Sequence, residues 1–162
     1  NGGLFPETHR PIFMQKLLRS PLGSVLAMAM SEQKLAESLR KVFGPETPPN
    51  ALECAAFWQL VSHNQGPRIM PKLIRYIDER RAQRARWIPA MQFTRVPMRL
   101  INGPVDPVSG EHMALRYHEL IPNPDIVLLP GIGHYPQVEA PDQVLQAFNE
   151  FQDRLLAAGQ RL

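Results

Sequence analysis

Hydrophobic residues in the first half of the chain recur every three to four positions, in short segments that prolines and glycines separate. The pattern begins at Ile12, is interrupted at Pro21 and Gly23, and resumes after Ser31. The Ser31 hydroxyl can cap the helix that follows, because it can accept a hydrogen bond from a free backbone N–H of the first turn. This spacing predicts a succession of helices from Ile12 to about Gln92.

Two longer helices are predicted within this region. Thr47-Pro48 favours a helix start, because a capping hydroxyl directly precedes a proline at the first helical position. A second apolar stripe extends from about Arg68 to Trp87, and Pro89 should end that helix. Tyr76 precedes Trp87 by eleven residues, which is close to three full turns, so we expect both rings on one face.

The pattern changes near Val96, where short apolar runs begin to alternate with helical segments. Val96–Ile101 and Asp125–Leu129 are predicted strands, and the second has the continuous apolar character of a strand buried on both faces. Ser109 should cap the helix between them, and Pro141 should begin a final helix. Such alternation predicts an α/β fold, with parallel strands joined by right-handed crossovers.

Two parallel strands do not make a stable sheet by themselves, because parallel strands need neighbours and helices on both faces. We therefore expect residues 93–162 to be the C-terminal part of a larger α/β core, and residues 1–92 to be a helical cap with the loop that precedes it. The other strands are expected before Asn1 in a longer protein, or on another chain that completes the sheet. Alone, the chain should associate through the unpaired edge of its first strand.

Composition narrows the class of protein. The 162 residues are 44% hydrophobic and 20% charged, which excludes general disorder. Cys54 is the single cysteine, so no internal disulfide can form, and we expect a cytoplasmic protein because nothing indicates an oxidising compartment. Its apolar helical surroundings favour a packing role for Cys54 over a nucleophilic one. No apolar run approaches about 18 residues, so no membrane span is predicted.

The charge distribution argues against nucleic-acid binding, and the histidine spacing argues against a metal site. The formal net charge is +3, and half of the 18 Lys and Arg lie between Arg68 and Arg99. Few aromatic residues interleave with these cations, so a solvated helix face is favoured over nucleic-acid contact. His112 and His118 are six residues apart and would point to opposite sides of a helix. We therefore predict no metal site and no cofactor.

Asp106 and His134 carry the candidate chemistry, because each follows a predicted strand by a few residues. Ligands in open α/β sheets bind beyond the carboxyl ends of the strands. A neutral imidazole can take a proton from a nucleophile or from water, and a carboxylate behind it fixes the tautomer and stabilises the imidazolium. We predict that these residues are the acid and base of a three-residue catalytic set whose nucleophile is absent from this chain.

The motifs around the pair resemble those of α/β-hydrolase-fold enzymes. Gly133-His134-x-Pro136-x-x-Glu139-x-Pro141 is similar to the pattern around the catalytic histidine of the epoxide hydrolase and haloalkane dehalogenase branch. Gly103-x-x-Asp106-Pro107 is similar to the acid motif of the same branch. The run Asn1–Pro11 resembles the mesoderm-specific transcript subfamily, and the likeness extends essentially from end to end.

This resemblance implies a hydrolase in which Asp106 orients His134 and His134 activates water to hydrolyse a covalent ester. The nucleophile of the related enzymes, usually an aspartate, would precede Asn1, so the isolated chain is expected to be inactive. The implied substrates are small apolar molecules with an ester, epoxide or carbon–halogen bond. Tyr76 and Trp87 are candidates to line their cavity between cap and core, with helix packing as the alternative role of both rings.

Two features leave alternatives open. Epoxide hydrolases polarise the epoxide with two cap tyrosines, and the cap region here contains only Tyr76. The alternative function is a non-catalytic, hydrolase-fold binding or scaffold protein whose contact surface is the basic helix from Arg68 to Trp87.

Overall fold

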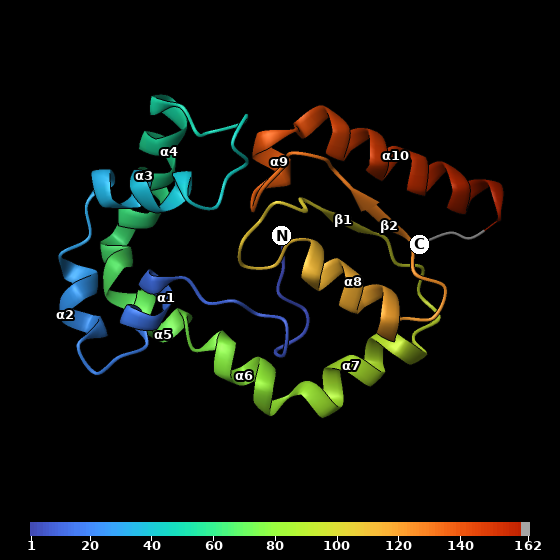
Figure 1. Cartoon of the computed structure of the whole chain (residues 1–162), viewed down its shortest axis with the longest axis horizontal. Coiled ribbons are helices and arrows are strands. Elements are labelled where there is room, and N and C mark those ends of the chain that lie inside the picture. Colours follow the sequence, from blue (N-terminus) through green and yellow to red (C-terminus); the bar gives the residue numbers. More distant parts are fainter. Residues whose placement is uncertain (160–162) are drawn as a thin grey trace.

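Short helices dominate the first half of the chain in a computed structural model that describes residues 1–159. Figure 1 shows the first four helices and the following 3-10 segment gathered on one side of the molecule: α1 Phe13–Leu18, α2 Gly23–Met28, α3 Glu32–Arg40, α4 Ala51–Ser62 and η1 His63–Ile69. The break predicted at Pro21 and Gly23 separates α1 from α2. Ser31 caps α3 as predicted, because its hydroxyl accepts from the Lys34 N–H.

The prediction of one continuous helix from Arg68 to Trp87 is wrong. It is divided among η1 and three further helices, α5 Met70–Leu73, α6 Tyr76–Ala82 and α7 Arg84–Phe93. The segment is divided because its apolar side chains are buried in two different clusters. Ile74 and Ile77 pack with Leu18 and Ala27 in the helical group, whereas Ile88 packs with Phe5 beside the sheet. One straight helix would not reach both clusters, and α7 also continues past Pro89 instead of ending there.

The strands are parallel, as predicted. β1 Leu100–Asn102 pairs with β2 Ile126–Leu128, with Leu100 opposite Ile126. The crossover between them contains α8 Glu111–Leu120, and the chain continues through α9 Pro136–Glu139 and α10 Pro141–Ala157, which lies along the sheet in Figure 1. β1 is shorter than predicted, because Val96 to Arg99 lie outside the paired region. Pro141 begins α10 as expected.

Two predicted helix caps are wrong, because both hydroxyls have other partners. Asn50 caps α4 in place of Thr47, and its side-chain oxygen accepts from the Glu53 N–H at 2.9 Å. Gly110 occupies the cap position of α8 in place of Ser109. The hydroxyls of Thr47 and Ser109 do not cap these helices, and they donate instead to carboxylates in the candidate site described below.

The loop before α1 is part of the hydrophobic core. Phe5 is fully buried and packs against side chains of α7 and α8 and the residue that follows α8: Ile88, Met113, Tyr117 and Ile121. The backbone N–H of Arg10 donates to the carbonyl of Val108 at 3.2 Å, which attaches the loop to the segment between β1 and α8. Figure 1 accordingly shows the N-terminal segment passing between the helical group and the sheet.

Within the described residues, no helix combines the length and the apolar character that crossing a membrane requires. Cys54 is buried in α4, where its surroundings agree with a packing role.

Candidate active site

Asp106 is held in a tight turn just beyond the end of β1. The residue is only 2% exposed, and Oδ1 accepts from the Val108 N–H at 2.8 Å. Oδ2 accepts from the N–H and the hydroxyl of Ser109, at 3.1 and 2.9 Å. The fully buried Asn102 supports this turn, because its amide donates to the carbonyls of Ser109 and Gly110. The end of β1 therefore fixes the direction of the carboxylate.

His134 lies beyond the end of β2, on a loop that Gly131 turns at a φ of +77°, which glycine adopts without strain. Its Nδ1 lies 2.7 Å from Asp106 Oδ2. An ionised carboxylate can only accept hydrogen bonds, so Nδ1 carries the hydrogen, and in the neutral imidazole Nε2 then holds the lone pair. The His134 side chain is 23% exposed, which leaves the imidazole accessible to water.

The carboxyl of Asp106 stays ionised although it is buried. Burial by itself would raise its pKa, but the hydrogen bond and charge of His134, the Val108 N–H and the Asn1 amide lower it and together outweigh burial. Together these contacts hold the pKa of Asp106 at about 2. The pair can therefore stabilise an imidazolium at neutral pH.

Asn1 joins the loops that carry the two residues. Its Nδ2 contacts the carbonyls of Gly103 and Gly133 at 2.8 and 3.2 Å and Asp106 Oδ2 at 3.1 Å. Its Oδ1 accepts from the Gly103 N–H at 2.9 Å. Sequence reasoning assigned Asn1 to a loop and missed this role, because the sequence contains no signal for contacts across so many residues.

An aromatic cluster borders His134. The ring of Tyr135 packs edge-on to the imidazole at 5.0 Å between centroids, and it contacts Phe43 and Phe57 at 5.3 and 5.2 Å. Burial raises the pKa of the Tyr135 hydroxyl, and the charges of Asp106 and Tyr76 add to that rise. The surroundings of the imidazole are therefore mainly apolar on this side.

The expectation that Tyr76 and Trp87 share one helix face is wrong, because Tyr76 begins α6 and Trp87 lies in α7. Tyr76 is half-buried against the helical group, and the Arg80 guanidinium lies 4.4 Å above its ring. Trp87 is 42% exposed. The structure thus brings Asp106 and His134 together, whereas the two rings lie on separate elements.

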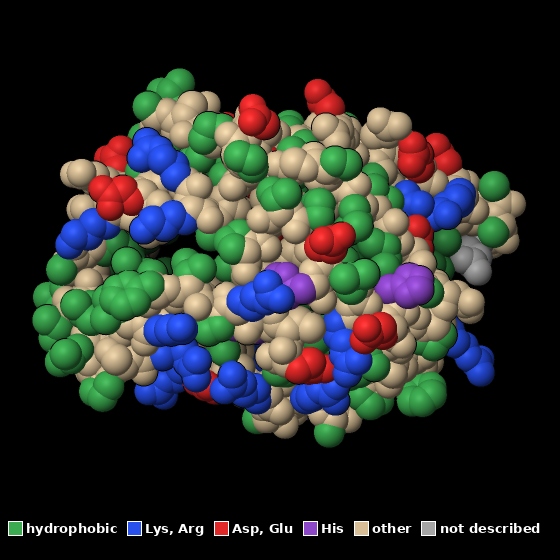
Figure 2. Space-filling view, viewed as in Figure 1, with side chains coloured by type: hydrophobic (Ala, Val, Ile, Leu, Met, Phe, Trp, Pro, Cys, Tyr) green, Lys and Arg blue, Asp and Glu red, His purple; other side chains and the backbone are tan. Residues whose placement is uncertain are grey.

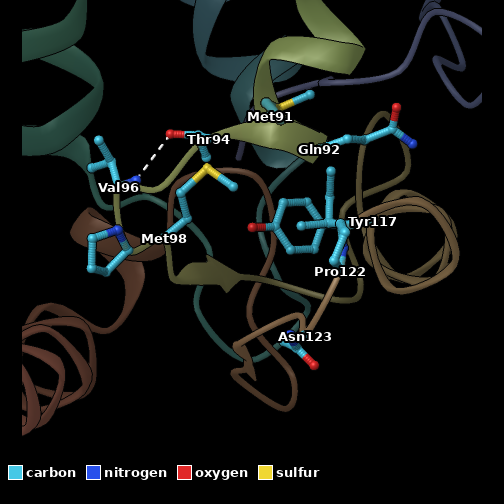
Figure 3. A pocket seen from close by; sticks show the side chains of 10 residues that line it. Met91, Gln92, Thr94, Val96, Met98, Tyr117, Pro122 and Asn123 are labelled. Carbon is cyan, nitrogen blue, oxygen red and sulfur yellow. Dashed lines mark hydrogen bonds between the residues drawn. The ribbon is translucent and has the colours of Figure 1, made fainter.

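Two cavities lie away from the Asp106–His134 pair. One, of about 270 Å³, is lined mainly by apolar side chains of the helical group, chiefly Met14, Leu17, Leu26, Met30, Leu35 and Met70. The other, of about 230 Å³, lies between the end of α7 and the end of α8. Figure 3 shows the Tyr117 ring in this second cavity with Met98 and Pro122, while Thr94 accepts from the Val96 N–H at its edge. Neither lining includes Asp106 or His134.

Two cations of the basic stretch between Arg68 and Arg99 form ion pairs outside it, Arg84 with Glu7 and Arg99 with Asp125. Figure 2 shows Lys and Arg side chains along the edge that α6 and α7 form in Figure 1. Arg84 makes a two-point contact with Glu7, at 2.9 and 2.6 Å, and Arg116 also reaches Glu7. Arg19 pairs with Asp78 on α6. Across residues 1–159, no group of three or more His, Cys, Asp or Glu side chains is arranged to hold a metal ion.

Relatives of the chain are found by sequence. No protein-family model matches it. It is 36% identical over 155 residues to the mesoderm-specific transcript protein of Mus musculus, and 37% identical to the homolog protein of Homo sapiens. It is 41% identical over 149 residues to LipZ of Mycobacterium tuberculosis, which bears a provisional hydrolase name. These matches cover 91–93% of the chain but 46–51% of the relatives, so it spans about half their length.

Solved structures resemble the fold. The chain superimposes on a membrane phospholipase A described as a bacterial virulence factor, with a TM-score of 0.55 and 20% identity. It superimposes on Cfl2 of Burkholderia cenocepacia with a TM-score of 0.60 and 16% identity. The matches cover 83% and 88% of this chain, and 44% and 50% of those structures. At such identities the likeness concerns the fold alone, and no comparison supports the narrower epoxide hydrolase and haloalkane dehalogenase branch.

Proposed function

We propose that this chain, an α/β relative of hydrolase-fold proteins by sequence and structure, supplies the base and the acid of a hydrolase active site. The observation that carries the proposal is the 2.7 Å contact between His134 Nδ1 and the buried Asp106 Oδ2. Both side chains lie beyond the carboxyl ends of adjacent parallel strands, where open α/β sheets bind their ligands.

In this proposal, Asp106 and His134 act on a water molecule. Nε2 of His134 takes a proton from water, and the resulting hydroxide attacks the ester carbon of a covalent intermediate. With an aspartate nucleophile, the attacked atom is the acyl carbon of the aspartyl ester, and its bond to the oxygen that it shares with the substrate breaks. The water oxygen stays in the regenerated carboxylate, and the imidazolium gives its proton to the leaving alkoxide oxygen. The carboxylate of Asp106 stabilises the imidazolium while it exists. The nucleophile belongs to a longer protein or to another chain, and by family resemblance an aspartate is the first candidate.

The proposed substrates are small apolar molecules with an ester, epoxide or carbon–halogen bond. The cluster of Phe43, Phe57 and Tyr135 supports an apolar substrate, because it makes the surroundings of the imidazole apolar on this side. Residues 1–92 would cover the substrate as a cap, and residues 93–162 would belong to the core. Tyr76 remains a candidate substrate contact, and the exposed Trp87 would lie at the rim.

The substitution His134→Gln in the full-length protein tests this function. With aryl esters, styrene oxide and 1-haloalkanes as probe substrates, we expect the variant to form the covalent intermediate but to hydrolyse it slowly, so that a mass increase accumulates on the protein. The matched control is His118→Gln, which changes an exposed histidine of α8 and should turn over like the wild type. Wild-type turnover by His134→Gln would refute the proposal.

A further inference from the structure

Glu139, the last residue of α9, gathers four hydrogen bonds on one half-buried carboxylate. Oε2 accepts from the Gly44 N–H at 2.7 Å, the Thr47 hydroxyl at 2.7 Å and the Gly133 N–H at 2.8 Å. Oε1 accepts from the Tyr135 N–H at 2.9 Å. Hydrogen bonds to an ionised acceptor are roughly twice as strong as those between neutral groups. The carboxylate therefore organises its surroundings more firmly than an amide would.

The donors belong to two segments that are far apart in the sequence. Gly44 and Thr47 lie in the loop between α3 and α4, whereas Gly133 and Tyr135 flank the proposed base. Each segment contributes two donors, so neither can move away without losing half of the contacts of the carboxylate. Glu139 is thus a junction between the helical group and the histidine loop.

Backbone contacts in the same place show how closely the segments approach. The N–H of His134 donates to the carbonyl of Val42 at 2.8 Å. A Cβ on Gly44 would lie 2.0 Å from the carbonyl oxygen of Gly131, and one on Gly133 would lie 2.4 Å from that of Val42. Only glycine fits at these two positions while the segments remain in contact. The proposed base is therefore held by the helical group as well as by Asp106.

We propose that Glu139 is a positioning residue, through which the loop between α3 and α4 holds His134 in line with Asp106. Its carboxylate does not contact the imidazole, so it would act by fixing the backbone on both sides of the base. When the loop is in contact, the imidazole is aligned; when the loop moves away, the alignment is lost. Alignment of the base would then depend on the position of the helices that cover the site. This inference rests on the function proposed above.

The main test compares Glu139→Gln with Glu46→Gln in the full-length protein. Glu46 is an exposed carboxylate of the same loop, and its replacement should leave the four hydrogen bonds of Glu139 intact. A glutamine at 139 has one acceptor oxygen and presents an NH2 group to a backbone N–H. Amide hydrogen exchange should then accelerate about tenfold or more at residues 42–47 and at residues 133–135 together. In the same variant, kcat should fall by about 10²-fold with little change in KM, because a small displacement of a catalytic group has that effect.

A second pair of variants keeps the test informative if Glu139→Gln fails to fold. Thr47→Val removes a single donor and should accelerate exchange in both segments by a smaller factor, whereas Thr47→Ser should restore wild-type exchange and kcat. Acceleration confined to residues 133–135 would refute the link between the two segments, and unchanged kcat with both segments accelerated would refute the positioning role. Hydrogen exchange needs no turnover. If neither the wild type nor His134→Gln reacts with the probes, the proposed function fails, and the positioning role fails with it. The exchange data still decide whether Glu139 links the two segments.

Discussion

The backbone N–H of His134 donates to the carbonyl oxygen of Val42 at 2.8 Å, so the proposed base is tied to the end of the α3 segment through the main chain. No side-chain substitution removes this bond directly. The side chain of His134 is fixed separately, by Asp106 at 2.7 Å. Substitutions at Asp106 therefore test the imidazole's orientation without removing the backbone support of its loop.

Asp106→Asn should reduce kcat by about 10³- to 10⁴-fold in the full-length protein. The amide keeps the shape of the carboxylate but can donate to Nδ1, which favours the tautomer that carries its hydrogen on Nε2. That imidazole cannot accept a proton from water. The measurement is kcat and KM with the reactive probe substrate. Activity within tenfold of the wild type would show that Asp106 does not orient the base.

Asp106 should also make stability depend on pH in the acid range. Its pKa is about 2 in the folded chain, against an ordinary value of 3.8, so its ionisation stabilises the fold above pH 4. That contribution is about 2 kcal/mol, roughly half of it is lost by pH 3, and most of it is lost by pH 2. Urea unfolding of the wild type and Asp106→Asn at pH 7, 5 and 3 measures it. The difference between the two proteins should shrink as pH falls, and a constant difference would contradict this assignment.

Asn1→Asp should damage the site more than Asn1→Ala. The Asn1 amide lies 3.1 Å from Asp106 Oδ2, so an aspartate there would bring a second carboxylate against the first. Repulsion between like charges should raise the pKa of Asp106, and a carbon-13 NMR titration of its carboxyl measures that change. We expect kcat/KM to fall by about tenfold or more for Asn1→Asp. Gly2→Ala is the control, because a Cβ at Gly2 meets nothing within 4 Å.

Gly44→Ala should destabilise the protein by about 2–4 kcal/mol, because the added methyl would force apart two main-chain segments. The methyl carbon would lie 2.0 Å from the Gly131 carbonyl oxygen, and neither segment can yield without losing its contacts to Glu139. Thermal unfolding of Gly44→Ala beside Gly2→Ala measures the effect. A melting temperature for Gly44→Ala equal to that of the control would mean that the approach of the two segments is not tight.

The 162-residue chain by itself should be inactive toward the probe substrates and should associate in solution. Within residues 1–159, β1 and β2 pair only with each other, so the outer edge of each is free to pair with another strand. Several large apolar side chains are also well exposed, including Phe13 at 76%, Leu52 at 82% and Phe93 at 81%. Light scattering after size-exclusion chromatography tests this. A monodisperse monomer that unfolds cooperatively would contradict the expectation.

The features that sequence analysis predicted correctly depend on local pattern. The Ser31 cap, the Pro141 helix start and the two parallel strands each follow from a short run of residues. The proximity of Asp106 and His134 was also predictable, because neighbouring parallel strands end at the same edge of a sheet.

The features that sequence analysis missed depend on distant partners. Thr47 and Ser109 have the chemistry of helix caps, yet both donate to carboxylates, and the partner of Thr47 lies near the far end of the chain. The apolar stripe from Arg68 to Trp87 is continuous in sequence, but its side chains enter two different clusters, so the helix is divided. Asn1 and Glu139 were not identified as supports of the site, although Glu139 belongs to the motif around the histidine, because their contacts are made only once the chain is folded.

The burial of Phe5 decides where this chain can be recombined with its relatives. Residues 1–11 precede the helices in sequence, but Phe5 is enclosed by Ile88, Met113 and Tyr117, and Arg10 is bonded to Val108. A chimera that exchanges the helices of one relative for those of another should therefore place its first junction after Pro11 and leave the preceding loop with α8. With a junction before Phe5, the side chain at position 5 would come from the other relative, and it would have to fit the space that Met113 and Tyr117 leave for Phe5.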